Sequence, residues 1–268
     1  MYSIIAVAGP SSSGKTTFLK RLTIQLEVDG IHPLGLSLDD YYVDRERTVR
    51  DEKGEYDYEA LEAIDLELLN EHLERILRGE AVRTAHYDFQ SGKSIPDGGH
   101  EIALRPSSVL LIEGIHALNP KLFAFVEEGQ VFRIFIHPAT ALPFDPLTSF
   151  EPADVRLLRR IVRDRHTRGA TAEQNIARWP SVRRGERLHI YPHQGHADCV
   201  FDTSLVYEVS VLKVFAERYL LEVPRASPQF SAALRLRKLI APFVTIYPDH
   251  VPPTSMLREF IGGSGFTY

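Results

Sequence analysis

The sequence of 268 residues contains little sulfur: it has one cysteine, Cys199, and two methionines. A single cysteine cannot close a disulfide within the chain, so the core must hold the fold together. Proteins of a reducing compartment use cysteine this sparingly. We therefore expect a cytoplasmic protein in which Cys199, beside Val200 and Phe201, is a small core residue.

The sequence also lacks long apolar runs and an excess of basic residues. No run is long enough to span a bilayer, and the first residues form neither a basic leader nor an apolar signal core. The 31 lysines and arginines are outnumbered by 36 aspartates and glutamates, which gives a net charge of −5. We therefore expect neither a nucleic acid nor a membrane as partner.

Apolar residues make up 44% of the chain, enough for a sizeable core. Runs typical of buried strands alternate with amphipathic helical patterns. The expected strands cover residues 2–8, 33–38, 108–115 and 131–137, and the expected helices cover 15–28 and 61–78, with Gly79 just past the end of the second. This alternation predicts an α/β fold with a doubly wound parallel sheet. Residues 81–89 and 100–106 flank the turn-rich segment 90–99 and predict a β-hairpin insertion.

The second half of the chain is expected to be mainly helical. A proline-rich connection over residues 139–152 precedes an arginine-rich helix over 154–169, a polar loop over 181–198 and a helix over 203–223. After Pro224 the composition shifts to a helical tail. We therefore predict a main domain, residues 1–223, with a lid over about 154–190, and a helical C-terminal extension, residues 224–268, packed on it.

The stretch GPSSSGKTT, residues 9–17, matches the phosphate-loop pattern G-x-x-x-x-G-K-[ST] between an expected strand and an expected helix. The glycines let backbone N–H groups turn onto phosphate oxygens, and the helix adds its N-terminal donors. Lys15 should reach the β- and γ-phosphates, and the Thr16 hydroxyl should ligate Mg²⁺. The predicted ATP-binding residues are Gly9, Ser11, Ser12, Ser13, Gly14, Lys15, Thr16 and Thr17.

Acidic residues follow two of the expected strands. LSLDDYY places Asp39 and Asp40 at the carboxyl edge of the sheet, where ligands bind in open α/β sheets. A carboxylate there can orient and deprotonate an attacking hydroxyl, hold Mg²⁺, or do both. VLLIEGI places Glu113 at the end of another strand as a second acid. Such acids can also simply end a strand in a turn, but the phosphate loop favours the functional interpretation.

Arginines crowd the helix that follows the proline-rich connection. Arg156, Arg159 and Arg163 share one helical face, Arg160 lies close to it, and Arg168 comes just after the helix. Guanidinium groups stabilise the charge on a transferring phosphoryl group, so the cluster predicts a local anion site. The alternative is a solvated basic face or an RNA-binding strip.

Six motifs occur in a fixed order: GPSSSGKTT, LSLDDYY, EYDYEALEAIDLELL, HYDF, LLIEGIHAL and LRRIVRDRHTRG. In this order they resemble the uridine kinase and phosphoribulokinase family of P-loop kinases, over roughly residues 1–210. The tail motif LREFIGGS is similar to that of bacterial uridine-kinase-like nucleoside kinases. The resemblance implies a P-loop kinase domain that phosphorylates the 5′-hydroxyl of a uridine- or cytidine-like nucleoside.

The resemblance also implies roles for single residues. Asp39 matches the acid that activates the 5′-hydroxyl and helps to hold Mg²⁺, Glu113 a second magnesium contact, and Asp57 the acid that binds the ribose hydroxyls. The aromatic positions of the nucleoside pocket match Tyr42, Tyr87 and Phe89, of which Phe89 stacks on the base. The lid arginines match Arg160, Arg163 and Arg168. The resulting catalytic set is Asp39, Lys15, Arg163 and Arg168.

Three positions depart from the family pattern, and all three concern substrate recognition. Gly92 stands where known uridine kinases have a histidine that contacts the pyrimidine, Ala170 replaces a lid arginine, and Arg178 aligns with a glutamine. Losing a polar contact to a base edge changes discrimination strongly. Lys93 and Arg178 could substitute, for a differently shaped or more anionic acceptor.

The predicted function is transfer of the γ-phosphate of ATP to a nucleoside hydroxyl, with Mg²⁺ as cofactor. Within enzymes, the alternative is a kinase for another nucleoside, a sugar or a sugar phosphate, as in phosphoribulokinase. An alternative from another class is a nucleotide-dependent switch or an RNA-associated ATPase, against which the acidic net charge and the acid of LDDYY argue. Because related kinases form dimers or tetramers, a homo-oligomer is a further expectation.

Overall fold

The computed structural model describes residues 3–52, 54–127, 129–139, 142–143 and 149–267. The chain forms two compact units, each built from segments that are distant in sequence. The sheet unit comprises residues 1–10, 22–135 and 184–200, and the helical unit comprises residues 11–21, 136–183 and 201–268. Each unit has a hydrophobic core of its own. The domain boundary expected after residue 223 stays a prediction.

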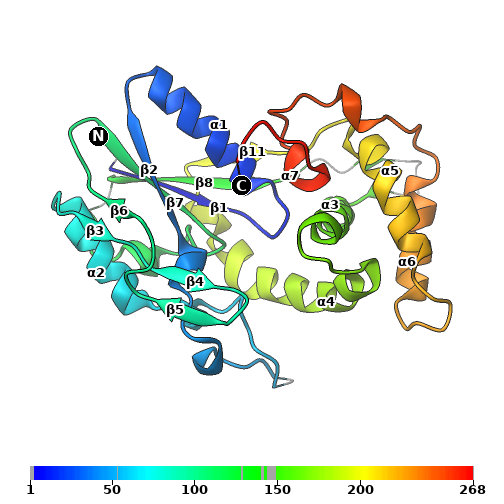
Figure 1. The fold of residues 1–268 in the computed structure, drawn as a ribbon, viewed down its shortest axis with the longest axis horizontal. Coiled ribbons are helices and arrows are strands. Elements are labelled where there is room, and N and C mark those ends of the chain that lie inside the picture. The colour runs from blue at the N-terminus through cyan, green and yellow to red at the C-terminus, as the bar shows by residue number, and fades with distance from the viewer. Residues whose placement is uncertain (1–2, 53, 128, 140–141, 144–148, 268) are drawn as a thin grey trace. The chain divides into compact units, whose positions relative to one another are not determined.

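A five-stranded sheet carries most of the buried strands (Figure 1). Its strands are β1 (Ile4–Ala8), β2 (His32–Ser37), β7 (Ser108–Glu113), β8 (Val131–His137) and β11 (Cys199–Asp202). They lie in the order β11-β8-β1-β7-β2, with β1 parallel to β7 and β8, and β2 parallel to β7. The predicted α/β fold with a parallel sheet is confirmed. Tyr2, the expected start of the first strand, lies outside the described residues.

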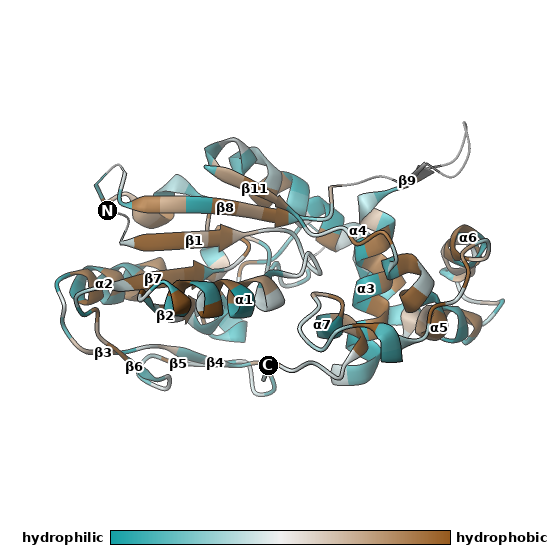
Figure 2. Ribbon diagram, turned by 90° about the horizontal axis from the view of Figure 1, so that it is seen from above, coloured by the Kyte–Doolittle hydropathy of each residue, from teal (hydrophilic) through white to brown (hydrophobic). Residues whose placement is uncertain are grey.

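Central and edge strands of this sheet differ in burial. In β1, Ile4 and Ala6 are fully buried, and Figure 2 shows β1 and β7 as almost continuously hydrophobic. β11 was not expected from the sequence; it lies at an edge of the sheet, and all four of its residues are exposed. The core position expected for Cys199 is therefore wrong, because an edge strand leaves its side chain in solvent.

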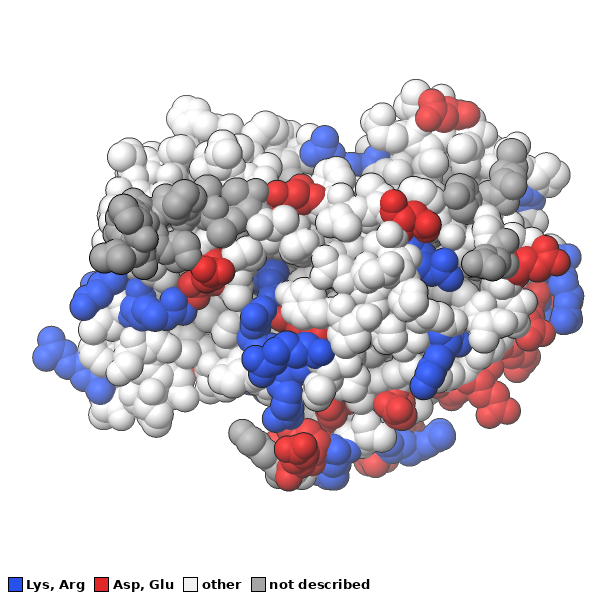
Figure 3. Space-filling view, turned by 180° about the vertical axis from the view of Figure 1, so that it is seen from behind, with Lys and Arg blue, Asp and Glu red and all other residues white. Residues whose placement is uncertain are grey.

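The first two helices lie close to their expected positions. α1 spans Lys15–Val28, as predicted. α2 spans Leu66–Leu77 and begins later than residue 61, because the Asp65 carboxylate accepts a hydrogen bond from the Leu68 amide at 3.1 Å. The buried face of α2 is mainly apolar, and its outer face pairs arginines with glutamates, in the charged region at the lower right of Figure 3.

The predicted hairpin insertion forms two short antiparallel ladders. The outer ladder pairs β3 (Val82–Arg83) with β6 (Glu101–Ile102), as expected. The inner ladder pairs β4 (His86–Asp88) with β5 (Lys93–Ile95). The expectation of a turn throughout residues 90–99 is therefore wrong for β5, whose short length gives no period-2 signal.

The helical unit contains α3 (Pro152–Thr167), most of α4 (Ala172–Gly185), α5 (Glu208–Leu221), α6 (Phe230–Ile240) and α7 (Arg258–Ile261). A short antiparallel pair, β9 (Leu142–Pro143) with β10 (Ser149–Phe150), precedes α3; the rest of the proline-rich connection lies partly outside the described residues. Three of these helices were predicted: the arginine-rich helix corresponds to α3, the helix over residues 203–223 to α5, and the helical tail contains α6. None of the helices in the described part of the chain has the length and hydropathy of a membrane span.

The polar loop expected over residues 181–198 is wrong. α4 continues to Gly185, and it is followed by a π-helical turn, Glu186–Ile190, and a 3₁₀ segment, Tyr191–His196. Ile190 joins the core of the sheet unit and Glu186 is fully buried, so tertiary packing keeps this polar sequence helical.

Candidate active site

The phosphate loop lies between β1 and α1, in the strand–loop–helix context that its motif requires. Its backbone enters the left-handed region at Ser12, φ 59°, and Gly14, φ 95°. A Cβ atom at position 14 would also lie 2.9 Å from the Met256 Cε atom. The positive φ favours glycine at this position, and a side chain there would also displace the flexible end of Met256.

The loop offers hydrogen-bonding groups suited to a polyphosphate. The buried hydroxyl oxygens of Ser12 and Ser13 have no hydrogen-bond partner among the described residues. Lys15 and Thr16 are half-buried at the first turn of α1, where backbone N–H groups and the helix dipole favour anions. Hydroxyls, amides and one ammonium group around a left-handed turn fit a nucleotide triphosphate.

Three arginines of α3 hold this loop. Arg156 Nη1 donates to the Ser11 carbonyl at 3.1 Å, and Arg160 Nη1 donates to the Ser11 hydroxyl at 2.9 Å. Arg159 Nη1 reaches the carbonyl of Ser13 at 3.3 Å. Arg156 and Arg159 are each only 1% exposed, so a solvated basic face is wrong for these two. They fix the backbone that a phosphate would contact.

Arg159 belongs to a buried ion pair that the sequence analysis missed. Its Nε atom donates to Glu208 Oε2 at 2.6 Å, with side-chain exposures of 1% and 3%. Its Nη2 atom donates to the Thr203 carbonyl at 2.8 Å, and the Thr203 hydroxyl donates to the Ser13 carbonyl at 2.7 Å. Glu208 thus neutralises the buried guanidinium that supports the loop.

The predicted lid arginines gather around one carboxylate, that of Asp164. Arg163 donates from Nε at 2.9 Å, and its Nη2 atom lies 2.7 Å from the same oxygen. Arg160 and Arg168 approach Asp164 at 3.5 and 3.8 Å, and Arg168 remains 62% exposed. Asp164 has no motif of its own and was missed, yet it brings together the three positions expected to act on phosphate.

In the sheet unit, Ser37 joins the two predicted acidic positions. Its hydroxyl accepts a hydrogen bond from the Asp39 amide at 3.3 Å and donates to Glu113 Oε1 at 3.0 Å. Ser37 and Glu113 are partners in the parallel register of β2 and β7, and Val7 of β1 pairs with Glu113 on the other side. Both acids therefore lie at the carboxyl edge from which the phosphate loop also leaves β1.

Negative charge collects around Tyr42, just beyond this edge. Burial, followed by the charges of Asp39, Glu59 and Glu113, raises the pKa of Tyr42 well above its usual value. Glu59 was missed by the sequence analysis. Asp57, whose role at the ribose hydroxyls stays a prediction, accepts a hydrogen bond from the Glu59 amide at 3.1 Å and shapes the turn that carries Glu59. A cluster of carboxylates can hold a cation or accept hydrogen bonds from an alcohol.

The predicted aromatic residues do come together. Ring centroids lie 5.5 Å apart for Tyr42 and Tyr87, 5.0 Å for Tyr87 and Phe89, and 6.3 Å for Tyr42 and Phe89. Phe89 is 61% exposed, unlike the other two, which are buried. The group offers one free aromatic face beside a buried pair, an arrangement suited to a planar ring or a sugar.

Gly92, a departure from the family pattern, is explained by Arg45. A Cβ atom at position 92, where φ is 73°, would lie 2.6 Å from the Arg45 guanidinium carbon. Arg45 Nη2 donates to the Phe89 carbonyl at 2.8 Å, and the Tyr58 hydroxyl beside it raises the pKa of Arg45. Gly92 thus leaves room for a cation beside the aromatic group.

The role suggested for Lys93 and Arg178 as substitutes stays a prediction. Lys93 pairs with Glu46 at 3.1 Å and Asp44 at 3.6 Å, and it is half-exposed. Arg178 is exposed on α4 of the helical unit, and Ala170 lies between α3 and α4. Arg45, which donates to the Phe89 carbonyl, is a further cation that the structure places beside this residue.

Comparison with known proteins agrees with this geometry. Residues 4–210 match the model of the phosphoribulokinase / uridine kinase family. The chain belongs to this family. It is 30% identical over 198 residues to a uridine kinase of Brevibacillus brevis, covering 74% of this chain and 83% of that one. It is 32% identical over 201 residues to a uridine kinase of Staphylococcus aureus, covering 74% and 86%.

Membership of the family makes the protein a P-loop kinase, a phosphotransferase, and confirms the resemblance drawn from the ordered motifs. A solved structure, D-glycerate 3-kinase from Cryptococcus neoformans, is similar with a TM-score of 0.50 and 16% identity, covering 72% of this chain and 80% of that one. That likeness concerns the fold alone. Residues 211–268, which include most of α5, α6 and α7, lie beyond the range that the family model matches.

Proposed function

We propose that this kinase transfers the γ-phosphoryl group of ATP to the 5′-hydroxyl of a uridine- or cytidine-like nucleoside. The observation that carries the proposal is the edge of the parallel sheet, where Asp39 and Glu113 are joined through Ser37 and from which the phosphate loop departs. Kinase chemistry needs an acid to position the acceptor beside a bound triphosphate, and this edge supplies one.

The donor is bound by the phosphate loop. Its amides, the Ser12 and Ser13 hydroxyls and Lys15 take the phosphate oxygens, and Gly9 and Gly14 allow the backbone to close around them. The Thr16 hydroxyl and the carboxylates of Asp39 and Glu113 are oxygen ligands of the kind that Mg²⁺ prefers, so these residues would hold it. When bound, Mg²⁺ neutralises charge on the β- and γ-phosphates.

The acceptor is bound by the sheet unit. Asp39 orients the attacking hydroxyl and accepts its proton as the bond to phosphorus forms. Phe89 stacks on the acceptor ring, while the buried rings of Tyr42 and Tyr87 pack against Phe89. Asp57 binds hydroxyl groups of the sugar, and Glu59, whose amide donates to Asp57, adds a second carboxylate on the same turn.

The lid arginines act on the transferred group. Arg163 and Arg168, held by Asp164, and Arg160, held by Asn175 at 3.0 Å, carry more positive charge than Asp164 cancels. The excess charge stabilises the phosphoryl group in the transition state, where negative charge spreads over its oxygens. Such a lid also excludes water, which suppresses hydrolysis of ATP.

The Arg45–Gly92 contact favours a second candidate: an acceptor that carries an anionic group, such as a sugar phosphate. A guanidinium group beside an exposed aromatic ring binds a phosphate or carboxylate well, and it binds a base carbonyl more weakly. Arg45 accordingly takes the place of the base-contacting histidine, in a different chemical form.

An acceptor panel tests both candidates. Purified enzyme is incubated with ATP, Mg²⁺ and single nucleosides, sugars or sugar phosphates, and the products are identified by mass spectrometry. We expect uridine or cytidine monophosphate as the main product. Preferred turnover of a sugar phosphate would support the second candidate, and absence of ADP formation with every acceptor would sink both.

A further inference from the structure

The C-terminal segment, residues 251–262, contacts the phosphate-binding end of α1 within the helical unit. The main-chain amide of Thr17 donates to Glu259 Oε2 at 3.0 Å, and the Thr17 hydroxyl donates to the same oxygen at 2.9 Å. Thr17 is fully buried and lies in the first turn of α1, among the helix amides that have no partner within the helix. A carboxylate of the chain thus holds a group of the phosphate loop.

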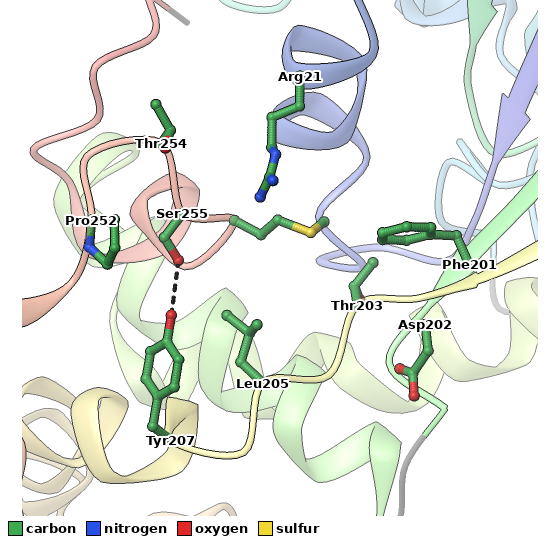
Figure 4. Close-up of a pocket in the computed structure, with 10 residues that line it drawn as sticks. Arg21, Phe201, Asp202, Thr203, Leu205, Tyr207, Pro252, Thr254 and Ser255 are labelled. Carbon is green, nitrogen blue, oxygen red and sulfur yellow. Dashed lines mark hydrogen bonds between the residues drawn. The ribbon is translucent and has the colours of Figure 1, made fainter. Parts of the chain in front are cut away.

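The same segment reaches the loop at a second point. The Met256 Cε atom lies 2.9 Å from the position of a Cβ atom on Gly14, and Thr203 lies 4.0 Å from it. These two residues line a pocket of about 350 Å³, whose other walls include Arg21, Phe201 and Pro252. Figure 4 shows Arg21 pointing from α1 toward the C-terminal segment.

Further contacts hold the C-terminal segment in place beside the phosphate loop. Phe260 is 1% exposed, and the guanidinium carbon of Arg159 lies 5.1 Å from the centroid of its ring. The hydroxyls of Ser255 and Tyr207 are hydrogen-bonded at 3.2 Å (Figure 4). Arg159 therefore contacts both the Ser13 carbonyl of the loop and Phe260, the neighbour of Glu259. The same arginine thus supports the phosphate loop and the C-terminal segment.

Carboxylates and phosphates bind to the same donors. The amide and hydroxyl of Thr17, at a helix N-terminus, form the kind of site that takes a phosphate oxygen. Both donors point at a single oxygen of Glu259, so a nucleotide phosphate can use them only after Glu259 has left. When the chain itself occupies a binding site, only the molecules with an open site can bind the ligand. The apparent dissociation constant is then the intrinsic constant divided by the fraction of open molecules.

We propose that the C-terminal segment is a displaceable wall of the donor site, in which Glu259 holds Thr17 until a phosphate group of the nucleotide replaces it. The proposal rests on the proposed function only in taking the loop as the nucleotide site. It assigns a task to residues that lie beyond the range matched by the family model. The C-terminal segment weakens nucleotide binding in the resting enzyme, and binding of the donor displaces it.

The test compares the full-length Glu259→Gln variant with wild type by calorimetric titration of ATP with Mg²⁺. Glutamine keeps the shape but removes the charge that competes with phosphate, so we expect the dissociation constant to fall about three- to thirtyfold. Asp249→Asn is the matched control, because Asp249 is exposed in the same tail and makes no side-chain hydrogen bond among those described. The control should bind ATP as wild type does.

A structural role gives the opposite results. If Glu259 only caps α1, Glu259→Gln will leave ATP affinity unchanged or weaken it, which overturns the proposal. Hydrogen exchange supplies a second readout: ATP should speed exchange of amides in residues 256–262 of wild type, and stronger protection there would contradict displacement. If neither wild type nor the variant binds ATP, the proposed function itself is wrong. If both bind ATP with equal affinity, only the proposal of a displaceable C-terminal segment is wrong.

Discussion

The two regions proposed to bind the two substrates differ in the charge built into them. In the sheet unit, carboxylates of Asp39, Glu59 and Glu113 surround Tyr42. In the helical unit, guanidinium groups of α3 contact the phosphate loop and cluster at Asp164. Phosphoryl transfer needs both kinds of environment, because an alcohol must be held by an acceptor of protons and a polyanion by donors. The difference in charge supports the proposal that the sheet unit binds the acceptor and the helical unit binds the phosphates of the donor.

The largest expected effect comes from the acidic region. Asp39→Asn removes the group that takes the proton of the attacking hydroxyl, and we expect turnover to fall by about 10³. A coupled assay of ADP formation measures this loss. Asp29→Asn, at an exposed position after α1, should keep full activity. Turnover of Asp39→Asn close to wild type would remove Asp39 from the mechanism.

The basic region depends on a buried ion pair, Arg159 with Glu208. Glu208→Ala leaves Arg159 charged, buried and without its 2.6 Å partner, so the free energy of unfolding should drop by about 3–5 kcal/mol. Urea denaturation measures the change. Glu217→Ala, exposed on the same helix α5, should lower it by less than about 0.5 kcal/mol. Equal stability of the two variants would show that the pair does not support the loop.

Arg163 tests whether the basic region also acts on the transferred phosphoryl group. Arg163→Ala should lower kcat about a hundredfold, because one donor to the transferring group is lost while the loop stays in place. Arg165→Ala, on the same helix but paired with Glu222 at 3.0 Å, serves as control. Initial rates at saturating ATP separate the two. A change in ATP affinity alone would instead assign Arg163 to ground-state binding.

The smallest effect is expected at the rim of the acceptor region. Arg45→Ala should raise KM for the acceptor about tenfold and leave kcat nearly unchanged, because Arg45 is proposed to bind the acceptor without contacting the reacting hydroxyl. Arg47→Ala, exposed on the same short helix, is the control. The ratio of KM values for uridine and for a sugar phosphate then shows which acceptor Arg45 recognises. An unchanged ratio would make its role purely structural.

Local sequence patterns were sufficient for much of this account. The buried strands, the helix after the phosphate loop and the acids at strand ends follow from hydrophobic period and turn chemistry. The grouping of Tyr42, Tyr87 and Phe89 followed from the family resemblance. Each of these features depends on a few consecutive residues or on an ordered set of motifs.

Other features depend on pairings that no local pattern contains. Glu259 meets Thr17 across 242 residues of sequence, and Glu208 meets Arg159 across 49. Arg45 explains Gly92 only once the hairpin has folded onto it. The polar stretch after Gly185 stays helical because Ile190 is buried, which the polar composition hides. Tertiary contacts decide these positions, and a single sequence does not list them.

The most direct test of the separate tasks of the two regions is the dissociation constant of ATP in the absence of Mg²⁺, for which Asp39 is a proposed ligand, measured by calorimetry for Asp39→Asn beside wild type. The account predicts constants within about twofold of each other, although the variant transfers almost no phosphate, because donor binding is assigned to the loop and its arginines. A constant raised tenfold or more in a variant that remains folded would contradict it, since the acid would then serve the donor and not the acceptor.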